Sequence, residues 1–186
     1  TKLAKEISKV CGRRFEQPMI SIIKDRCRIQ MSEKPVYRIQ FGVAQHACDN
    51  AQLCGDSYDC FTDGKGRFVA IISDGMGTGG RAAVDGAMAS NIMGNLVKAG
   101  LGFDCALKIV NSAMQVKSGE ESLATLDVAV LDLFNGSLSV MKAGAPMSFI
   151  KKGRNVERLD AVSVPIGILD EAKFAYAKST LEENNW

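Results

Sequence analysis

The stretch that most constrains the fold covers residues 71–80, which read Ile-Ile-Ser-Asp-Gly-Met-Gly-Thr-Gly-Gly. A short apolar segment with strand character ends at the carboxylate of Asp74. Four glycines follow within six residues, and a long helical pattern then begins. Because glycine carries no Cβ, it leaves the surrounding backbone uncrowded. The pattern therefore predicts a charged side chain at the end of a rigid strand, with accessible backbone beside it.

Composition limits the chain to one ordinary globular domain. Its 186 residues, 46% apolar and 24% charged, can form a single sizeable core. The net charge of +2 comes from scattered basic residues, and no stretch reaches the roughly 18 apolar residues of a membrane helix. We therefore expect no nucleic-acid partner and no membrane contact from these residues. The start lacks Met and a signal segment, so we expect a piece of a longer protein.

The cysteines and the single histidine show no metal-binding spacing. Cysteines stand at positions 11, 27, 48, 54, 60 and 105, and none forms a Cys-x-x-Cys pair. Zinc sites normally contain closer ligand pairs. We expect reduced thiols, as in cytosolic proteins, and assign no catalytic role to His46.

Short apolar and alternating runs predict strands on both sides of a helical region. Two hairpins carry the clearest signals, Asp63-Gly64 and Asn135-Gly136, because tight hairpin turns need positive φ. A loop is predicted over 46–55. The predicted strands cover 19–23, 27–31, 37–45, 57–62, 67–73, 125–134, 137–142, 147–151, 156–159 and 174–178.

Helical spacing of apolar residues predicts two consecutive helices, over 81–99 and 104–118. Asp104 is a candidate N-cap of the second helix, and Gly100 a candidate stop for the first. A further helix over 1–12 precedes the strands. Since consecutive strands joined by hairpins favour antiparallel sheets, the predicted fold class is α+β, with helices packed on a sheet face. We divide the chain into an N-terminal helix and linker, 1–18, and a domain core, 19–186.

The first hairpin brings two carboxylates together. If Thr62 pairs with Arg67, then Asp56 faces Ser73, and Asp74 lies one position further along. The Cα atoms of the two aspartates would then be about 4.5–5.5 Å apart, or one diagonal further. Both carboxylates belong to the same end of adjacent strands.

Such a pair of carboxylates repels unless one is protonated or a cation lies between them. Hard cations such as Mg²⁺ and Mn²⁺ prefer oxygen ligands, and the carbonyl of Gly75 can join Asp56 and Asp74 because no Cβ blocks the approach. A turn or cap role for both aspartates fits the same pattern, and the residues alone leave the two interpretations open.

Residues 75–80 also fit Gly-x-Gly-x-x-Gly, a dinucleotide-binding pattern when it joins a strand to a helix. Three features oppose that interpretation. Asp74 would place a negative charge beside the pyrophosphate, and the preceding strand is predicted to be paired in a hairpin. A second helix also follows where a βαβ unit needs a strand. The pattern alone is a weak signal.

Five segments resemble the metal-dependent (type 2C, PPM-type) protein serine/threonine phosphatases, and most closely the phosphatase domain of the stage II sporulation protein E family. Their joint presence and order are more specific than two glycine-flanked aspartates. The segments are Cys-Gly-Asp-Ser-Tyr at 54–58, Ile-Ser-Asp-Gly-Met-Gly-Thr-Gly at 72–79, Ala-Thr-Leu-Asp at 124–127, Lys-Ala-Gly-Ala-Pro at 142–146 and Val-Pro-Ile-Gly-Ile at 164–168.

The resemblance implies an α/β/β/α sandwich of antiparallel sheets with a two-metal site for Mn²⁺ or Mg²⁺. Asp74 matches the catalytic aspartate that bridges both metals, Gly75 the carbonyl ligand and Asp56 the acidic residue on the partner strand. The implied reaction is attack of metal-activated water on a phosphoserine or phosphothreonine. The implied substrate is a phosphorylated regulatory protein, an anti-sigma-factor antagonist in sporulation control. The implied location is cytoplasmic, as a domain of a membrane-anchored parent.

The chain departs from the family pattern near its end. A second Ser-Asp-Gly segment is expected on a later strand, but none occurs before Trp186. We therefore expect a sandwich that is incomplete at the C-terminus, with weak metal binding and slow turnover. A missing strand would leave a sheet edge open, which favours a homodimer or strand swapping.

Several residues keep more than one interpretation. For Thr125 and Asp127 we favour bonding to a neighbouring loop over metal contact. Lys142 and Arg81 fit either contact with substrate phosphate or surface solubility. For the whole chain, the alternative to a phosphatase is a catalytically incomplete pseudophosphatase that binds a regulatory partner.

Overall fold

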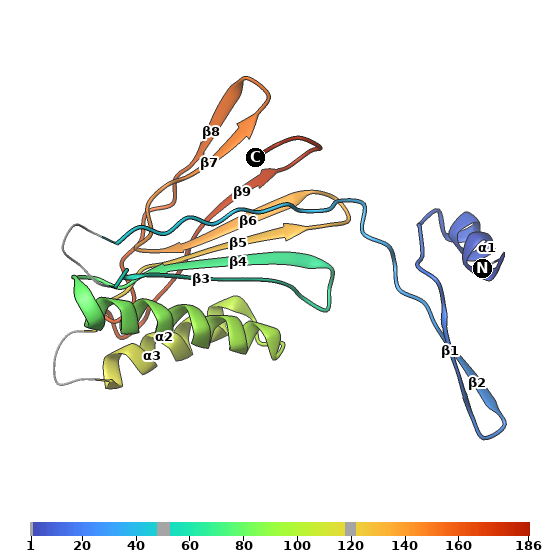
Figure 1. Cartoon of the computed structure of the whole chain (residues 1–186), viewed down its shortest axis with the longest axis horizontal. Coiled ribbons are helices and arrows are strands. Elements are labelled where there is room, and N and C mark those ends of the chain that lie inside the picture. Colours follow the sequence, from blue (N-terminus) through green and yellow to red (C-terminus); the bar gives the residue numbers. More distant parts are fainter. Residues whose placement is uncertain (1, 48–52, 118–121) are drawn as a thin grey trace.

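The computed structural model describes residues 2–47, 53–117 and 122–186 (Figure 1). Its three helices are α1 (Lys2–Cys11), α2 (Gly79–Lys98) and α3 (Phe103–Val116). The strands are β1 (Met19–Ile23), β2 (Arg26–Gln30), β3 (Asp56–Thr62), β4 (Arg67–Asp74), β5 (Leu126–Asp132), β6 (Ser137–Ala143), β7 (Ser148–Lys152), β8 (Asn155–Leu159) and β9 (Ala175–Thr180).

A five-stranded antiparallel sheet in the order β3-β4-β5-β6-β9 forms the centre of the domain. Both predicted hairpins are present, with positive φ at Gly66 (74°) in the first, not at Gly64, and at Gly136 (75°) in the second. The turn between β3 and β4 is further stabilised by the carboxylate of Asp63, which accepts the backbone N–H of Lys65 and Arg67. The predicted α+β class with antiparallel sheets is confirmed.

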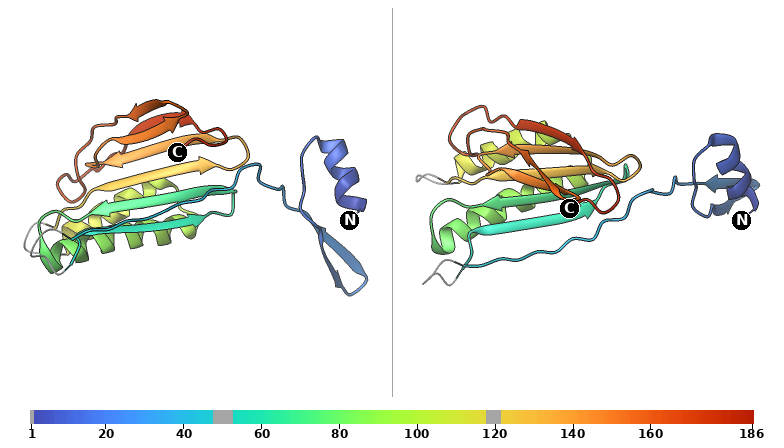
Figure 2. Two further views of the ribbon diagram at one scale, coloured as in Figure 1. Left: turned by 45° about the horizontal axis from the view of Figure 1, so that its top comes forward. Right: turned by 90° about the horizontal axis from the view of Figure 1, so that it is seen from above.

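The main core lies between the sheet and helices α2 and α3, which cover one face (Figure 2). Alternate strand residues such as Ile71 and Val128 point to the helices and are fully buried. They meet Met93 of α2 and Met114 of α3, which are also fully buried. The helical periodicity of the sequence identified the inward face of α3, but in α2 the buried row is Ala89, Met93 and Val97, while Val84 is exposed.

A second core covers the opposite face of the sheet. There the β7–β8 hairpin contributes Ile150 and Leu159, which pack on apolar side chains of β5 and β6. Tyr37 and Ile39 of the extended segment 36–47 pack on the same cluster. The predicted strand 37–45 is wrong, because this segment has no strand ladder. It crosses the face of the sheet instead of extending an edge, so Tyr37 and Ile39 are used for packing, whereas Phe41 and Val43 stay exposed.

The C-terminus of α2 follows the prediction, but the N-terminus of α3 does not. Gly100 (φ 95°) ends α2 as predicted, while Leu101 N–H donates to the carbonyl of Leu96. The predicted cap of α3 is wrong, because Gly102 holds the N-cap position. Asp104 lies in the first turn and accepts the hydroxyl of Tyr176 at 2.5 Å. Burial and this carboxylate raise the pKa of Tyr176 to about 12.

Helix α1 and the β1–β2 hairpin lie away from the central sheet (Figures 1 and 2). The helix predicted over 1–12 and the strands predicted near 19–23 and 27–31 are confirmed. The domain boundary between residues 18 and 19 stays a prediction. Among the described residues, no helix is both long and apolar enough to cross a membrane.

We expect Met93→Ala to lower the free energy of unfolding by about 2–5 kcal/mol, because it leaves a cavity in the main core. Chemical denaturation measures the change. Asn91→Ala is the matched control, since Asn91 is exposed on the same helix and its replacement should stay within about 0.5 kcal/mol. Equal effects of the two variants would contradict the assigned helix orientation.

Candidate metal centre

Asp56 and Asp74 stand directly opposite each other at the ends of β3 and β4. The predicted register was wrong by one residue, because Thr62 pairs with Phe68 and not with Arg67. The Asp63 N–H donates to Arg67 O across the turn, at 2.9 Å, so the loop holds one residue more than predicted. The shift brings the two carboxylates closer than the predicted register did.

The surroundings of Asp74 at the strand end raise its pKa. Burial, the negative charge of Asp56 and a hydrogen bond with Asp56 raise the pKa of Asp74. A carboxylate pair of this kind is stabilised either by a shared proton or by a cation. The electrostatics of the strand ends therefore fit a cation better than a pair of independent turn residues.

Helix α2 contacts the strand ends at the level of the backbone. A Cβ added at Gly75 would lie 1.9 Å from the carbonyl oxygen of Ala82, and one at Gly86 would lie 2.2 Å from that of Gly55. The Gly75 N–H donates to Gly55 O at 3.1 Å. Gly75 of the motif and Gly86 of α2 thus have a packing reason, which is the close approach of a helix to the two carboxylate-bearing strands.

The dinucleotide-binding interpretation is wrong for this fold. Strand β4 is paired antiparallel with both of its neighbours, and α2 leads into α3 instead of a parallel strand. A βαβ unit is therefore absent around residues 75–80. Gly77 (φ 101°) and Gly79 (φ 78°) form the turn into α2.

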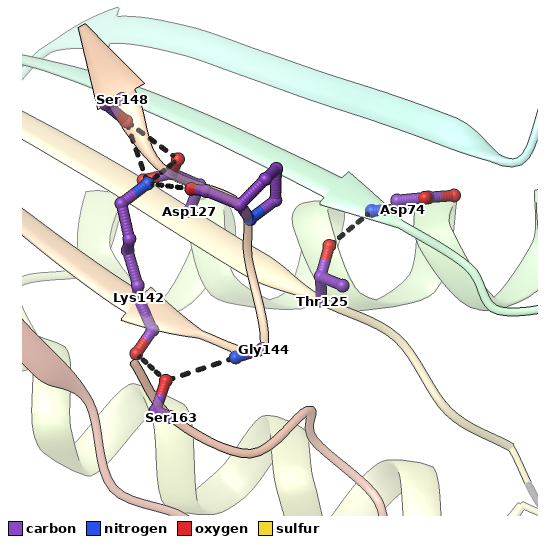
Figure 3. A network of polar contacts seen from close by, with 8 residues as sticks. Asp74, Thr125, Asp127, Lys142, Gly144, Ser148 and Ser163 are labelled. Carbon is purple, nitrogen blue, oxygen red and sulfur yellow. Dashed lines mark hydrogen bonds and ion pairs between the residues drawn. The ribbon is translucent and has the colours of Figure 1, made fainter. Parts of the chain in front are cut away.

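Thr125 binds the backbone of Asp74 through its side chain, as Figure 3 shows, and also through its main chain. Its Oγ1 accepts the Asp74 N–H at 3.0 Å, and its own N–H donates to Asp74 O at 2.8 Å. The hydroxyl of Ser73 donates to Thr125 O at 2.7 Å. These contacts support the favoured structural interpretation of Thr125.

Lys142 lies fully buried on the sheet face that faces β7 and β8 (Figure 3). Its Nζ contacts the Asp127 carboxylate, Pro146 O at 2.6 Å and Ser148 Oγ at 2.7 Å. The surface-solubility interpretation of Lys142 is wrong, because the side chain is fully buried. Its contact with substrate phosphate stays a prediction. Asp127 binds Lys142 and Ser148 and keeps one buried oxygen, Oδ1, without a partner. Arg81 lies in the first turn of α2, and its predicted phosphate contact stays a prediction.

The loop before β3 adds two further contacts to Asp56. Gln45 Nε2 donates to Asp56 O at 2.8 Å, and the thiol of Cys54 lies 3.4 Å from Asp56 Oδ2. The five cysteines in the described part of the chain are free thiols, while Cys48 and the rest of 48–52, half of the predicted loop 46–55, lie outside it. No group of three or more His, Cys, Asp and Glu side chains within the described residues is arranged to hold a metal.

The fold and the strand-end carboxylates define the class of the protein, which is the PP2C phosphatase fold. A solved structure of the PP2C domain with a fragment of the regulatory domain of SpoIIE from Bacillus subtilis matches 99% of this chain and 56% of that chain, at 25% identity and a TM-score of 0.78. RsbX in complex with magnesium has the same fold, with 16% identity and a TM-score of 0.62, over 91% of this chain and 75% of that chain.

The chain belongs to the stage II sporulation protein E (SpoIIE) family, whose family model matches residues 64–185. Stage II sporulation protein E of Bacillus subtilis is 34% identical over 135 residues, which is 73% of this chain and 16% of that protein. The protein of the same name from Priestia megaterium is 31% identical over 145 residues, 78% of this chain and 25% of that protein. The chain thus spans at most a quarter of these curated relatives.

We expect Asp74→Asn to raise the melting temperature of the metal-free chain at neutral pH. Because the pKa of Asp74 is raised by folding, the folded state binds more protons than the unfolded state above the ordinary aspartate range. Stability therefore falls as pH rises through that range, and Asn removes this loss. Thermal unfolding in chelator between about pH 4 and pH 8 should show a difference that grows with pH and then levels off.

Asp160→Asn is the control for this experiment, because Asp160 is an exposed aspartate outside the strand-end pair. A lower melting temperature for Asp74→Asn than for the parent chain at neutral pH would contradict the repulsion.

Lys142→Met should lower the free energy of unfolding by about 3–5 kcal/mol, because it leaves the Asp127 carboxylate uncompensated. The double variant Lys142→Met/Asp127→Leu should recover much of this loss. Chemical denaturation measures both. Lys152→Met is the control. Lys152 pairs with Glu157, and both side chains are more than a third exposed, so this substitution should cost at most about 1 kcal/mol. Equal costs at the two lysines would contradict the buried network.

Proposed function

We propose that this chain is part of a metal-dependent protein phosphatase that hydrolyses phosphoserine or phosphothreonine on a regulatory protein. The observation that carries the proposal is the direct opposition of Asp56 and Asp74, with the raised pKa of Asp74, in a chain of the SpoIIE family. PP2C phosphatase domains are the solved structures that this fold matches.

The proposed cation is Mn²⁺ or Mg²⁺. Asp56 and Asp74 would hold it through carboxylate oxygens, with the carbonyl of Gly75 as a further oxygen ligand. The oxygen-only donor set and the close like charges fit a hard divalent cation, and a related PP2C-fold protein, RsbX, has been solved with magnesium. A bound divalent ion supplies an activated water and positive charge for the phosphoryl oxygens.

The chain's own residues prepare the site for this chemistry. Asp74 is the proposed catalytic residue, because it stands at the strand end where the family motif places the bridging carboxylate. The glycines at 55, 75 and 86 keep side chains out of the space between the strand ends and α2. Arg81, in the first turn of α2, is a proposed contact for the substrate phosphate.

The proposed substrate is a phosphorylated anti-sigma-factor antagonist in sporulation control, acted on by a cytoplasmic domain. Support comes from the relatives, which are stage II sporulation proteins and include a solved RsbU domain. A homodimer stays a proposal; the two outer strands of the central sheet, β3 and β9, are the edges that such an assembly would use.

A second candidate function is a pseudophosphatase module that binds a regulatory partner without turnover. The observation that favours it is the donor set, because only two carboxylates come together within the described residues and no larger cluster forms there. This module would keep the fold and its surface while lacking part of the metal ligation.

Hydrolysis of a phosphoserine peptide in the presence of Mn²⁺ tests the enzymatic proposal. We expect phosphate release that is lost in chelator and reduced about a hundredfold or more by Asp74→Asn, since loss of a metal ligand should cost at least as much as loss of a residue that supports one. Asp160→Asn should leave the rate unchanged. Release that is independent of metal, or unaffected by Asp74→Asn, would overturn the proposal. Binding of the phosphoprotein without any turnover would favour the pseudophosphatase.

A further inference from the structure

We propose that Thr125 is a positioning residue of the metal centre, which holds the backbone of Asp74 so that its carboxylate faces Asp56. The inference rests on the proposed function, since it concerns the same pair of carboxylates. Thr125 itself contributes no ligand in this proposal. It acts through the main chain of the residue that does.

The regular ladder between β4 and β5 changes at the site, although its register continues to the bridge of Gly75 with Ala124. The last regular pair between β4 and β5 is Ile72 with Asp127, two residues before Asp74. Beyond that pair the Asp74 N–H is taken by a side chain, the Thr125 hydroxyl, at 3.0 Å. The Thr125 hydroxyl therefore takes the Asp74 N–H in place of the Thr125 carbonyl, while the Thr125 N–H keeps its backbone bond to Asp74 O.

Three hydrogen bonds connect Thr125 to two consecutive residues of β4. Its hydroxyl and its N–H bind the two polar backbone groups of Asp74, and its carbonyl accepts the hydroxyl of the fully buried Ser73. Bonds on both sides of the Asp74 Cα leave little freedom in the direction of its Cβ. Without them, two like charges in direct opposition would be free to move apart.

The segment that carries Thr125 is itself fixed. Ala124 is fully buried and bridges to both Gly75 and Ile166. The Met76 N–H donates to Leu123 O at 2.9 Å, and the Ile166 N–H donates to Ala124 O at 2.9 Å. Because its support is rigid, Thr125 can impose a position on Asp74 instead of following it.

The second carboxylate has its own support, independent of Thr125. The main chain of Asp56 accepts the side-chain amide of Gln45 at 2.8 Å. Removing the Thr125 hydroxyl should thus release one partner of the pair and leave the other in place. The expected effect is weaker metal binding without loss of either ligand.

Mn²⁺ binding to the full chain, measured by isothermal titration calorimetry, tests the inference. Thr125→Val keeps the shape but removes the acceptor, and should weaken binding about tenfold. Thr125→Ser keeps the hydroxyl and should stay within about twofold of the parent chain. Thr62→Val, the same substitution at the exposed far end of β3, should leave affinity unchanged. Asp74→Asn defines the binding that depends on the proposed site.

Amide hydrogen exchange of Asp74 in the metal-free chain gives a second readout. We expect faster exchange in Thr125→Val than in the parent chain and Thr125→Ser, because the amide loses its acceptor. If Thr125→Val does not fold, Thr125→Ala replaces it. Thr125→Ala and Thr125→Ser differ only in the hydroxyl, so we expect weaker binding and faster Asp74 exchange in Thr125→Ala than in Thr125→Ser.

The outcomes separate the two proposals. Mn²⁺ binding that depends on Asp74 but is equally tight in Thr125→Val and the parent chain would overturn the positioning role alone. Absence of any Asp74-dependent binding in the parent chain would overturn the metal centre, and the positioning role with it. Weakened binding with accelerated Asp74 exchange in Thr125→Val, restored in Thr125→Ser, would support both.

Discussion

The antiparallel pairing of β3 with β4 places two like charges at the same end of the sheet, and much of the surrounding structure follows from that constraint. Asp56 and Asp74 face each other in direct register. Their repulsion is tolerated because the neighbouring elements hold the strand ends from several sides. Helix α2 abuts them through glycine backbone, and the 122–126 segment holds β4 through hydrogen bonds. Because these contacts hold the two carboxylates close together, a cation bound between them would be stabilised.

The two faces of the central sheet are packed in different ways. The face covered by α2 and α3 is closed by apolar side chains, with Met93 and Met114 filling the space above Ile71 and Val128. The other face carries the acidic pair at one end and the Lys142–Asp127 pair further across. A buried ion pair contributes little net stability, but it is expensive to break, so it ties the loop before β7 to the sheet in one arrangement. The second face therefore combines a smaller apolar core with specific polar contacts among the described residues.

Local signals in the sequence predicted the secondary structure well where the reason is local. The Asp-Gly and Asn-Gly turns, the period of α2 and the stop at Gly100 each depend on the residues of one element. Predictions failed where residues distant in the sequence determine the local structure. Residues 37–45 alternate like a strand, yet they cross a sheet face that offers no free hydrogen-bonding edge. Asp104 resembles a cap, but the hydroxyl of Tyr176, 72 residues away, binds its carboxylate.

The sequence by itself determined that two aspartates end neighbouring strands and that glycine lies beside one of them, because hairpin pairing and backbone crowding follow from residue type and spacing. Family membership, read first from five short segments, was confirmed by the comparisons. Only the tertiary structure decided the register that places Asp56 opposite Asp74, since one extra residue in the turn is invisible in the residue pattern. It alone also assigned Thr125 to the Asp74 backbone and buried Lys142. Those contacts join strands that are far apart in the chain, and no local propensity encodes them.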